Sequence, residues 1–215
     1  MAAMAATSQP AARLRLFVAI TLPEAWRRYL AGREQALERL APGYARWVAP
    51  DLMHLTLVFL GELPAATLPT VQAALADAAA GQPAFPLSLG RLGHFGGAVP
   101  RVLWVEARAP AQRLPALHTA LCVALTARAV PFDGKPLVPH LTLGRARRDA
   151  APAAGRALAS RLPTLAAPPP PAPCTVDAIH LIRSDLSPRG PRYTPLGAYP
   201  LTERRLPGSQ AISEP

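Results

Sequence analysis

The pattern of apolar and polar residues divides most of the chain into short strands and helices. Residues 24–40 place Trp26, Leu30 and Leu37 on one face of a helix, and Pro23 suits its first turn. Further helices are predicted at about 65–80, at 111–129 and, from a weaker pattern, at 150–162. Strands are predicted at 15–22, 54–60, 85–92, 102–107, 139–145, 176–182 and 193–201, with a short extended piece at 47–48.

Turn residues and composition set the boundaries between these elements. Gly61 is expected to end the strand at 54–60, and the sequence GHFGGAVP at 93–100 is expected to form a turn between two strands. The sequence LAAPPPPAPC at 165–174 is too rich in proline for helix or sheet, and it predicts a stiff connector.

Short strands and helices are mixed along the chain, and a matching strand occurs in each half. This order predicts an α+β protein made of two similar lobes. Residues 14–202 are expected to form this single bilobal domain, with a flexible lead at 1–13 and a flexible tail at 203–215.

The tetrapeptide His-Leu-Thr-Leu occurs twice, starting at His54 and again at His140, although the chain has only five histidines. Because side chains alternate between the faces of a strand, the leucines point one way and the histidine and threonine the other. We expect buried leucines, with His54, Thr56, His140 and Thr142 on an open surface. Two such strands, related by a pseudo-two-fold axis, can face each other across a cleft and surround one small anion.

These groups fit the cleavage of a cyclic phosphodiester. Histidine titrates near neutral pH, so one imidazole can take a proton from water while the other protonates a leaving oxygen. Threonine hydroxyls can donate hydrogen bonds to the non-bridging oxygens, whose charge is redistributed in the transition state. No metal is required, because the paired histidines make both proton transfers.

Other kinds of site have less support in the sequence. Each motif supplies one imidazole without a carboxylate at ligand spacing, although Asp51 lies near the first motif. Cys122 and Cys174 have neither metal-ligand spacing nor a basic cluster beside them. The sequences GxSxG, GxGxxG and GxxxxGK(S/T) do not occur at a strand-helix junction. No metal or other cofactor is therefore expected.

The positive net charge of the chain is consistent with a nucleic-acid partner but does not establish one. The formal net charge is +10, almost entirely from arginine because Lys135 is the only lysine, and a basic protein favours phosphate-rich partners. A GC-rich genome explains the same bias, because it raises Ala, Pro and Arg together. No apolar run approaches the ~20 residues of a membrane span and no secretion signal is recognisable, so a cytoplasmic protein without membrane contact is expected.

Two His-x-Thr motifs in this order resemble the 2H phosphoesterase superfamily. Five phrases are similar to the bacterial RNA 2′,3′-cyclic phosphodiesterase family, also named 2′-5′ RNA ligase: RLFVAITLP, RWVAPDLMHLTLVFLGE, PRVLWVEA, PLVPHLTLGRAR and YTPLGAYPL. The similarity covers about residues 14–202, and all four motif positions keep the family pattern. The departures are the longer N-terminal lead, the polyproline connector and the C-terminal extension.

The resemblance implies a bilobal α+β fold in which each pseudo-symmetric lobe has an antiparallel sheet flanked by helices, with the active-site cleft between the lobes. It also implies hydrolysis of an RNA 2′,3′-cyclic phosphate to a 2′-phosphate. Carried over from the family, His54 is the proton donor to the 3′ oxygen and His140 is the proton acceptor that activates water, while Thr56 and Thr142 bind the phosphate. The sequence by itself leaves the two histidine roles open.

Five further residues are candidates for substrate binding. Arg145 follows the second motif, where its guanidinium either pairs with phosphate oxygens or is a solvated strand end. Lys135 and Arg46 are further candidate cations beside the phosphate. Phe17 and Tyr193 are candidates to stack on a base, although an aromatic residue on a strand is more often part of the core.

The expected partner is RNA ending in a 2′,3′-cyclic phosphate, or a small cyclic nucleotide, bound by a monomer. Two alternatives stay open. One is the joining or cleavage of 2′-5′ linkages at the same site, and the other is a basic module that holds RNA ends or a nucleotide without turnover. Simple binding would not need two proton-transfer groups, which favours an enzyme.

Overall fold

The computed structural model describes residues 12–188 and 190–202, and over these residues the chain forms a curled antiparallel sheet with four α-helices. The strands are β1 (Arg13–Thr21), β2 (Ala45–Trp47), β3 (His54–Pro64), β4 (Phe85–Phe95), β5 (Val102–Arg108), β6 (His140–Ala146), β7 (Cys174–Val176), β8 (Ala178–Ser187) and β9 (Gly190–Pro200). The helices are α1 (Glu24–Leu40), α2 (Leu68–Ala80), α3 (Arg113–Ala127) and α4 (Pro152–Arg161). The predicted α+β class is confirmed.

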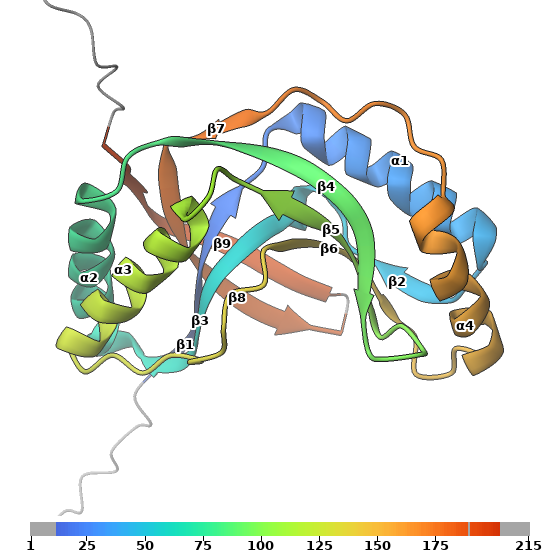
Figure 1. Cartoon of the computed structure of the whole chain (residues 1–215). Helices are drawn as coiled ribbons and strands as arrows, with labels where there is room; N and C mark the ends of the chain where they lie inside the picture. Colours follow the sequence, from blue (N-terminus) through green and yellow to red (C-terminus); the bar gives the residue numbers. More distant parts are fainter. Residues whose placement is uncertain (1–11, 189, 203–215) are drawn as a thin grey trace, which may run out of the picture.

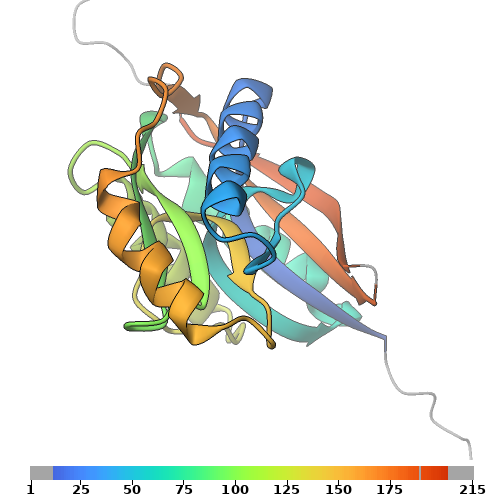
Figure 2. The ribbon, with the colours of Figure 1, turned by 90° about the vertical axis from the view of Figure 1, so that its right-hand side faces the viewer.

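The strands pair in the order β7-β4-β5-β6-β3-β1-β8-β9, and β2 pairs with β6. All of these pairs are antiparallel. The sheet curls across Figure 1, with α2 and α3 packed together at one end and α1 and α4 at the other. Figure 2, turned by 90°, shows α1 and α4 in front of the sheet. The sequence predicted one sheet per lobe, whereas one strand order runs through both halves because β3 and β6 pair at Leu55 and Leu141.

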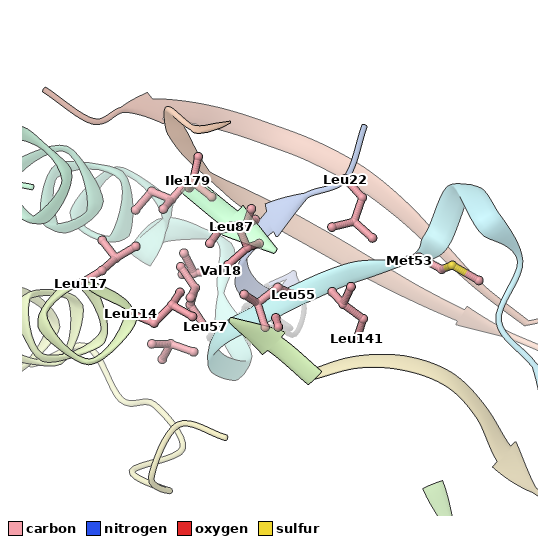
Figure 3. Close-up of a cluster of buried hydrophobic side chains, with 14 of the residues drawn as sticks. Val18, Leu22, Met53, Leu55, Leu57, Leu87, Leu114, Leu117, Leu141 and Ile179 are labelled. Carbon is pink, nitrogen blue, oxygen red and sulfur yellow. The ribbon is translucent and has the colours of Figure 1, made fainter. Parts of the chain in front are cut away.

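The leucines of the two motifs anchor the centre of the sheet in the core, as the alternation predicts. Leu55, Leu57, Leu141 and Leu143 are at most 4 % exposed. Figure 3 shows Leu55, Leu57 and Leu141 in the same apolar cluster as Leu117 of α3. Because side chains alternate along a strand, the burial of these leucines against the helices places the histidines and threonines on the opposite face of β3 and β6.

Strand β3 is longer than predicted, because Gly61 does not end it. Its pairing with β1 shifts register between Leu16 and Phe17 and again between Val18 and Ala19. Gly61 has φ +70°, a left-handed conformation that glycine adopts without strain, and it lies at the first shift. The glycine therefore bends the strand at a bulge and lets it continue.

Three other strand boundaries differ from the prediction. The predicted turn at 93–100 begins later, because β4 continues through His94 and Phe95, which pair with β5. The predicted strand at 176–182 is two strands, β7 and β8, and β8 forms a longer hairpin with β9 than expected. Hydrogen bonding to a neighbouring strand extends these segments past the point where their own composition predicts an end.

The polyproline connector has neither helix nor strand between η3 (Leu162–Thr164) and β7, as predicted. Three side chains of α1 donate hydrogen bonds to its carbonyl groups, which attaches it along the helix. The bonds run from Trp26 Nε1 to Ala172 at 3.1 Å, from Tyr29 Oη to Pro168 at 3.3 Å, and from Arg33 Nη1 to Ala166 at 2.9 Å.

The predicted lead and tail fall mainly on residues 1–11 and 203–215, outside the described residues, so both stay predictions, as does the single domain at 14–202. Arg13, which was assigned to the lead, is already part of β1. Over the described part of the chain, no helix is both long and apolar enough to cross a membrane.

Candidate active site

The two His-x-Thr motifs lie side by side at the centre of the sheet. Leu55 of β3 is the Cα partner of Leu141 of β6, and the strands are antiparallel. His54 and His140 each precede one of these leucines, so they lie on opposite sides of this pair as diagonal neighbours. Diagonal neighbours in an antiparallel pair have a separation of roughly 7–8 Å. The structure thus brings two segments 86 residues apart in the sequence (140 minus 54) onto one surface.

Each histidine makes the same hydrogen bond to the chain that precedes it. Nδ1 of His54 is 2.7 Å from the carbonyl oxygen of Leu52, and Nδ1 of His140 is 2.7 Å from that of Val138. A carbonyl oxygen only accepts, so Nδ1 carries the proton in both rings and donates it. The neutral tautomer therefore has a free lone pair on Nε2, which is the atom left to exchange protons with a ligand.

Burial holds both imidazoles toward the neutral form. It is the largest cause of the lowered pKa of His54, and the positive charge of His140 lowers that pKa further. Burial also lowers the pKa of His140, and the charge of Arg145 adds to the effect. The hydrogen bonds to Leu52 and Val138 act in the opposite direction, because they stabilise the imidazolium. The coupling between the two rings means that protonation of one disfavours protonation of the other.

Two aromatic rings, those of Phe17 and Tyr193, pack against the imidazole of His54. The ring centroid of Phe17 is 4.7 Å from that of His54, and Tyr193 meets the same imidazole edge-on at 5.3 Å. Phe17 and Tyr193 are 5.1 Å apart. Phe17 is only 3 % exposed, so its contact with His54 fixes the imidazole, while Tyr193 is partly exposed beside it.

A second aromatic pair, which the sequence interpretation missed, packs against His140. Phe95 meets the imidazole edge-on at 4.9 Å with an interplanar angle of 88°, and Trp104 lies at 6.3 Å. Phe95 was assigned to a turn, and it reaches the site because β4 continues through it. Trp104 reaches the site because it is the Cα partner of Thr142, a non-local pairing that the partial alternation of its own strand does not reveal.

A bulge brings Arg145 to the site face. Along β6 the partners of Leu103 and Trp104 are Gly144 and Thr142, so Leu143 has no partner on β5. Leu143 and Gly144 are consecutive buried residues, and the alternation resumes with an exposed Arg145 on the side of Thr142. The positive charge of Arg145 lowers the pKa values of both His140 and Tyr193, after the larger effect of burial on each group.

The other two candidate cations lie outside the two motif strands. Arg46 of β2 is exposed and is the cross-strand partner of Arg145. Lys135 is exposed in the segment before β6, where its Nζ is 2.7 Å from Oδ2 of Asp133. A role for either residue in binding substrate stays a prediction. Within residues 12–188 and 190–202, no three His, Cys, Asp or Glu side chains are grouped to hold a metal ion.

A curled antiparallel sheet that carries twin His-x-Thr strands side by side is the arrangement of the 2H phosphoesterases. A family model described as the 2′-5′ RNA ligase superfamily matches residues 20–188, and the chain belongs to that superfamily.

Individual relatives agree with this assignment. The RNA 2′,3′-cyclic phosphodiesterase of Thermus thermophilus is 34% identical over 195 residues, which cover 87% of this chain and 90% of the relative. The RNA 2′,3′-cyclic phosphodiesterase of Geobacillus stearothermophilus is 31% identical over 159 residues, 74% of this chain, and the match spans only 48% of that protein. A crystal structure of Escherichia coli LigT complexed with 3′-AMP superposes with a TM-score of 0.68 at 29% identity, covering 89% of this chain and 99% of LigT.

Proposed function

We propose that this protein hydrolyses the 2′,3′-cyclic phosphate end of RNA to a 2′-phosphomonoester. The proposal rests on the two imidazoles that flank the cross-strand pair Leu55–Leu141. In each ring Nδ1 is hydrogen-bonded to a backbone carbonyl, which leaves Nε2 available for proton transfer. Relatives named RNA 2′,3′-cyclic phosphodiesterase, of which one is 34% identical over most of both chains, support the substrate class.

In the proposed reaction the two imidazoles act on opposite sides of one phosphorus atom. Nε2 of neutral His140 accepts a proton from water, and the water oxygen attacks phosphorus. The bond between phosphorus and the 3′ oxygen breaks, and Nε2–H of protonated His54 gives its proton to that oxygen. The product keeps the phosphate on the 2′ oxygen, and the exchange of one proton between the two histidines restores the enzyme.

The remaining groups of the site are assigned to the charge of the phosphate. Thr56 and Thr142 share the face of the histidines and are partly exposed, so their hydroxyls are placed to donate to the non-bridging oxygens. Arg145 supplies a guanidinium, whose planar donors match a phosphate. Charge stabilisation and both proton transfers then come from protein side chains, and the proposed reaction proceeds without a metal ion.

The proposal includes a pseudo-two-fold relationship between two lobes, with the substrate in a cleft between them. Both motif strands break register at the second leucine of the motif: the pairing skips Leu57 in β3 and Leu143 in β6. Both histidines also use the same bond to a carbonyl two residues earlier. An axis through the Leu55–Leu141 pair relates these features, which supports the bilobal interpretation.

A second activity, the joining or cleavage of 2′-5′ linkages, is proposed as the alternative at the same site. The superfamily description that matches residues 20–188 favours it. With a 5′ hydroxyl in place of water, the same acid and base would open the cyclic phosphate to a 2′-5′ linkage and a free 3′ hydroxyl. The reverse of that step, attack of the 3′ hydroxyl on the linkage, would cleave it. We further infer that the protein acts as a monomer, because all four motif residues come from one chain.

The test is product analysis. An RNA oligomer ending in a 2′,3′-cyclic phosphate is incubated with the protein in the presence of a chelator, and phosphorus NMR identifies the position of the product phosphate. A 2′-phosphate is the expected product. A 3′-phosphate, a requirement for added metal, or tight binding without turnover would contradict the proposal. Adding an oligomer with a free 5′ hydroxyl then tests for 2′-5′ joining.

A further inference from the structure

A second group of arginines lies beyond the end of β6, outside the residues assigned to the reaction. Arg101, Arg147 and Arg148 line a cavity of about 400 Å³ together with Tyr44 and Pro100. All three arginines are exposed. Their guanidinium groups come from two segments far apart in the sequence, the turn after β4 and the chain after β6.

Backbone hydrogen bonds fix the floor of this cavity. The N–H of Ala146 donates to the carbonyl oxygen of Arg101 at 2.9 Å, and the N–H of Arg147 donates to that of Tyr44 at 2.9 Å. The hydroxyl of Tyr44, which is buried, donates to the carbonyl oxygen of Pro100 at 2.6 Å. The backbone from which the arginines project is thus held by hydrogen bonds, so a bound ligand would have to order only their side chains.

The cavity is strongly positive. Among the described residues, neither Arg101 nor Arg148 forms an ion pair, and Arg147 has one exposed partner, Asp149, at 3.3 Å. The guanidinium groups repel one another, and a bound anion would relieve that repulsion. Several positive donors around one cavity are suited to phosphate, which accepts hydrogen bonds from a guanidinium in a bidentate manner.

Strand β6 leads from the proposed active site toward this cavity, and Arg145 lies between the two along the chain. From His140 to Arg147 the chain advances seven residues, which spans about 23 Å in an extended strand. Arg145 lies on this path, and Arg46 is its neighbour on β2. This length exceeds that of one nucleotide, so a ligand whose terminal phosphate lies between the histidines must be a polymer to reach the cavity.

We propose that the cavity lined by Arg101, Arg147 and Arg148 binds backbone phosphates of the RNA segment that precedes the cyclic end. The proposal rests on the proposed function, and it names the substrate as an RNA chain of several nucleotides in preference to a mononucleotide. An oligomer would gain affinity from this cavity, whereas a cyclic mononucleotide would use the central site alone.

The experiment compares 2′,3′-cyclic AMP with a ten-nucleotide RNA that ends in a 2′,3′-cyclic phosphate. In the Arg101→Gln/Arg148→Gln variant, the KM for the RNA should rise roughly tenfold, and the dependence of log(kcat/KM) on log salt should weaken by about 1.4, or ~0.7 for each lost phosphate contact. The kinetics with 2′,3′-cyclic AMP should not change. The Arg28→Gln/Arg39→Gln variant removes two exposed charges from α1 and should behave as wild type with both substrates.

Equal losses with both substrates, no loss with either, or the same loss in the α1 variant would overturn the proposal. A wild-type protein that turns over neither substrate would contradict the proposed function instead. In that case the cavity is tested by the dissociation constant of the ten-nucleotide RNA, which fluorescence anisotropy measures. A tenfold weakening in Arg101→Gln/Arg148→Gln alone would support the cavity as an RNA site, and unchanged binding would overturn it.

Discussion

The imidazole rings of His54 and His140 are oriented by the same hydrogen bond. In each, Nδ1 is 2.7 Å from the carbonyl oxygen of the residue two positions earlier. The bond selects one tautomer and leaves Nε2 for the ligand in both rings. The rings nevertheless differ in their surroundings. His54 packs on Phe17 and Tyr193, whereas His140 packs on Phe95 and is influenced by Arg145. A symmetric pair of side chains can thereby take two different roles.

The pH dependence of hydrolysis should reveal both imidazoles. The pKa values of His54 and His140 are both lowered in the free protein, so the state with one ring protonated and one neutral is most populated on the acid side of the ordinary histidine value, ~6.5. The profile of kcat/KM, which reports the free enzyme, should be bell-shaped with its optimum there. The negative charge of bound substrate raises both pKa values, so the optimum of kcat should lie at higher pH. A flat profile from pH 5 to 9 would count against the pair.

Replacing Arg145 should weaken catalysis and change its pH dependence. In Arg145→Gln the loss of a charged donor to phosphate should lower kcat/KM by roughly 10–100-fold. The positive charge of Arg145 lowers the pKa of His140, so its removal should raise that pKa and move the acidic limb of the kcat/KM profile to higher pH. The matched control is Arg39→Gln, which removes an exposed arginine of α1 that has no assigned role in the site. Identical effects of the two substitutions would contradict a specific role for Arg145.

The threonine hydroxyls should act mainly in the transition state. Thr56→Val and Thr142→Val keep the shape of the side chain but remove the donor, and each should lower kcat about 100-fold with little change in KM. Steady-state kinetics with the cyclic oligomer measure this, and thermal melting shows whether the variants fold. A rise in KM at constant kcat would assign the hydroxyls to ground-state binding instead.

Local patterns predicted the centre of the fold better than its edges. The alternation in His-Leu-Thr-Leu was sufficient to place Leu55 and Leu141 in the core and the histidines opposite, because period-two burial is a local property of a strand. The extension of β4 through Phe95 was missed, since it depends on pairing with β5. The position of Arg145 required the bulge at Leu143, which no local pattern specifies. Local alternation therefore predicted which motif residues share a face of the sheet, whereas non-local pairing determined what surrounds them.

Glu34 should make the stability of the protein depend on pH. It is 8 % exposed on α1, and burial raises its pKa from 4.5 to about 8, although the N–H of Val48 opposes the shift. The folded state therefore binds the proton more tightly than the unfolded state. The contribution of Glu34 to stability should be greatest below pH 4.5, fall as the pH rises toward 8, and level off above it, with a total change on the order of 3–5 kcal/mol.

The Glu34→Gln variant should remove this dependence. Urea denaturation at pH 5 and pH 8 should show a smaller loss of unfolding free energy in the variant than in the wild type. Glu38→Gln is the control from the same helix, because the pKa of Glu38 is lowered by hydrogen bonds from the N–H of Gly43 and from Trp47 Nε1. This second variant should be destabilised at neutral pH. If the unfolding free energy of Glu34→Gln changed between pH 5 and pH 8 by as much as that of the wild type, Glu34 would ionise normally.

The most direct test of the two histidine roles uses a cyclic substrate in which sulfur replaces the bridging 3′ oxygen. With the normal oxygen substrate, His54→Ala and His140→Ala should each lose ~10²–10⁴-fold in rate. A thiolate leaves without being protonated, so the sulfur substrate should restore most of the rate to His54→Ala and none to His140→Ala. Rescue of His140→Ala in place of His54→Ala would reverse the assigned roles. Near-normal turnover of the oxygen substrate by either variant would contradict the claim that both imidazoles act at one phosphorus atom.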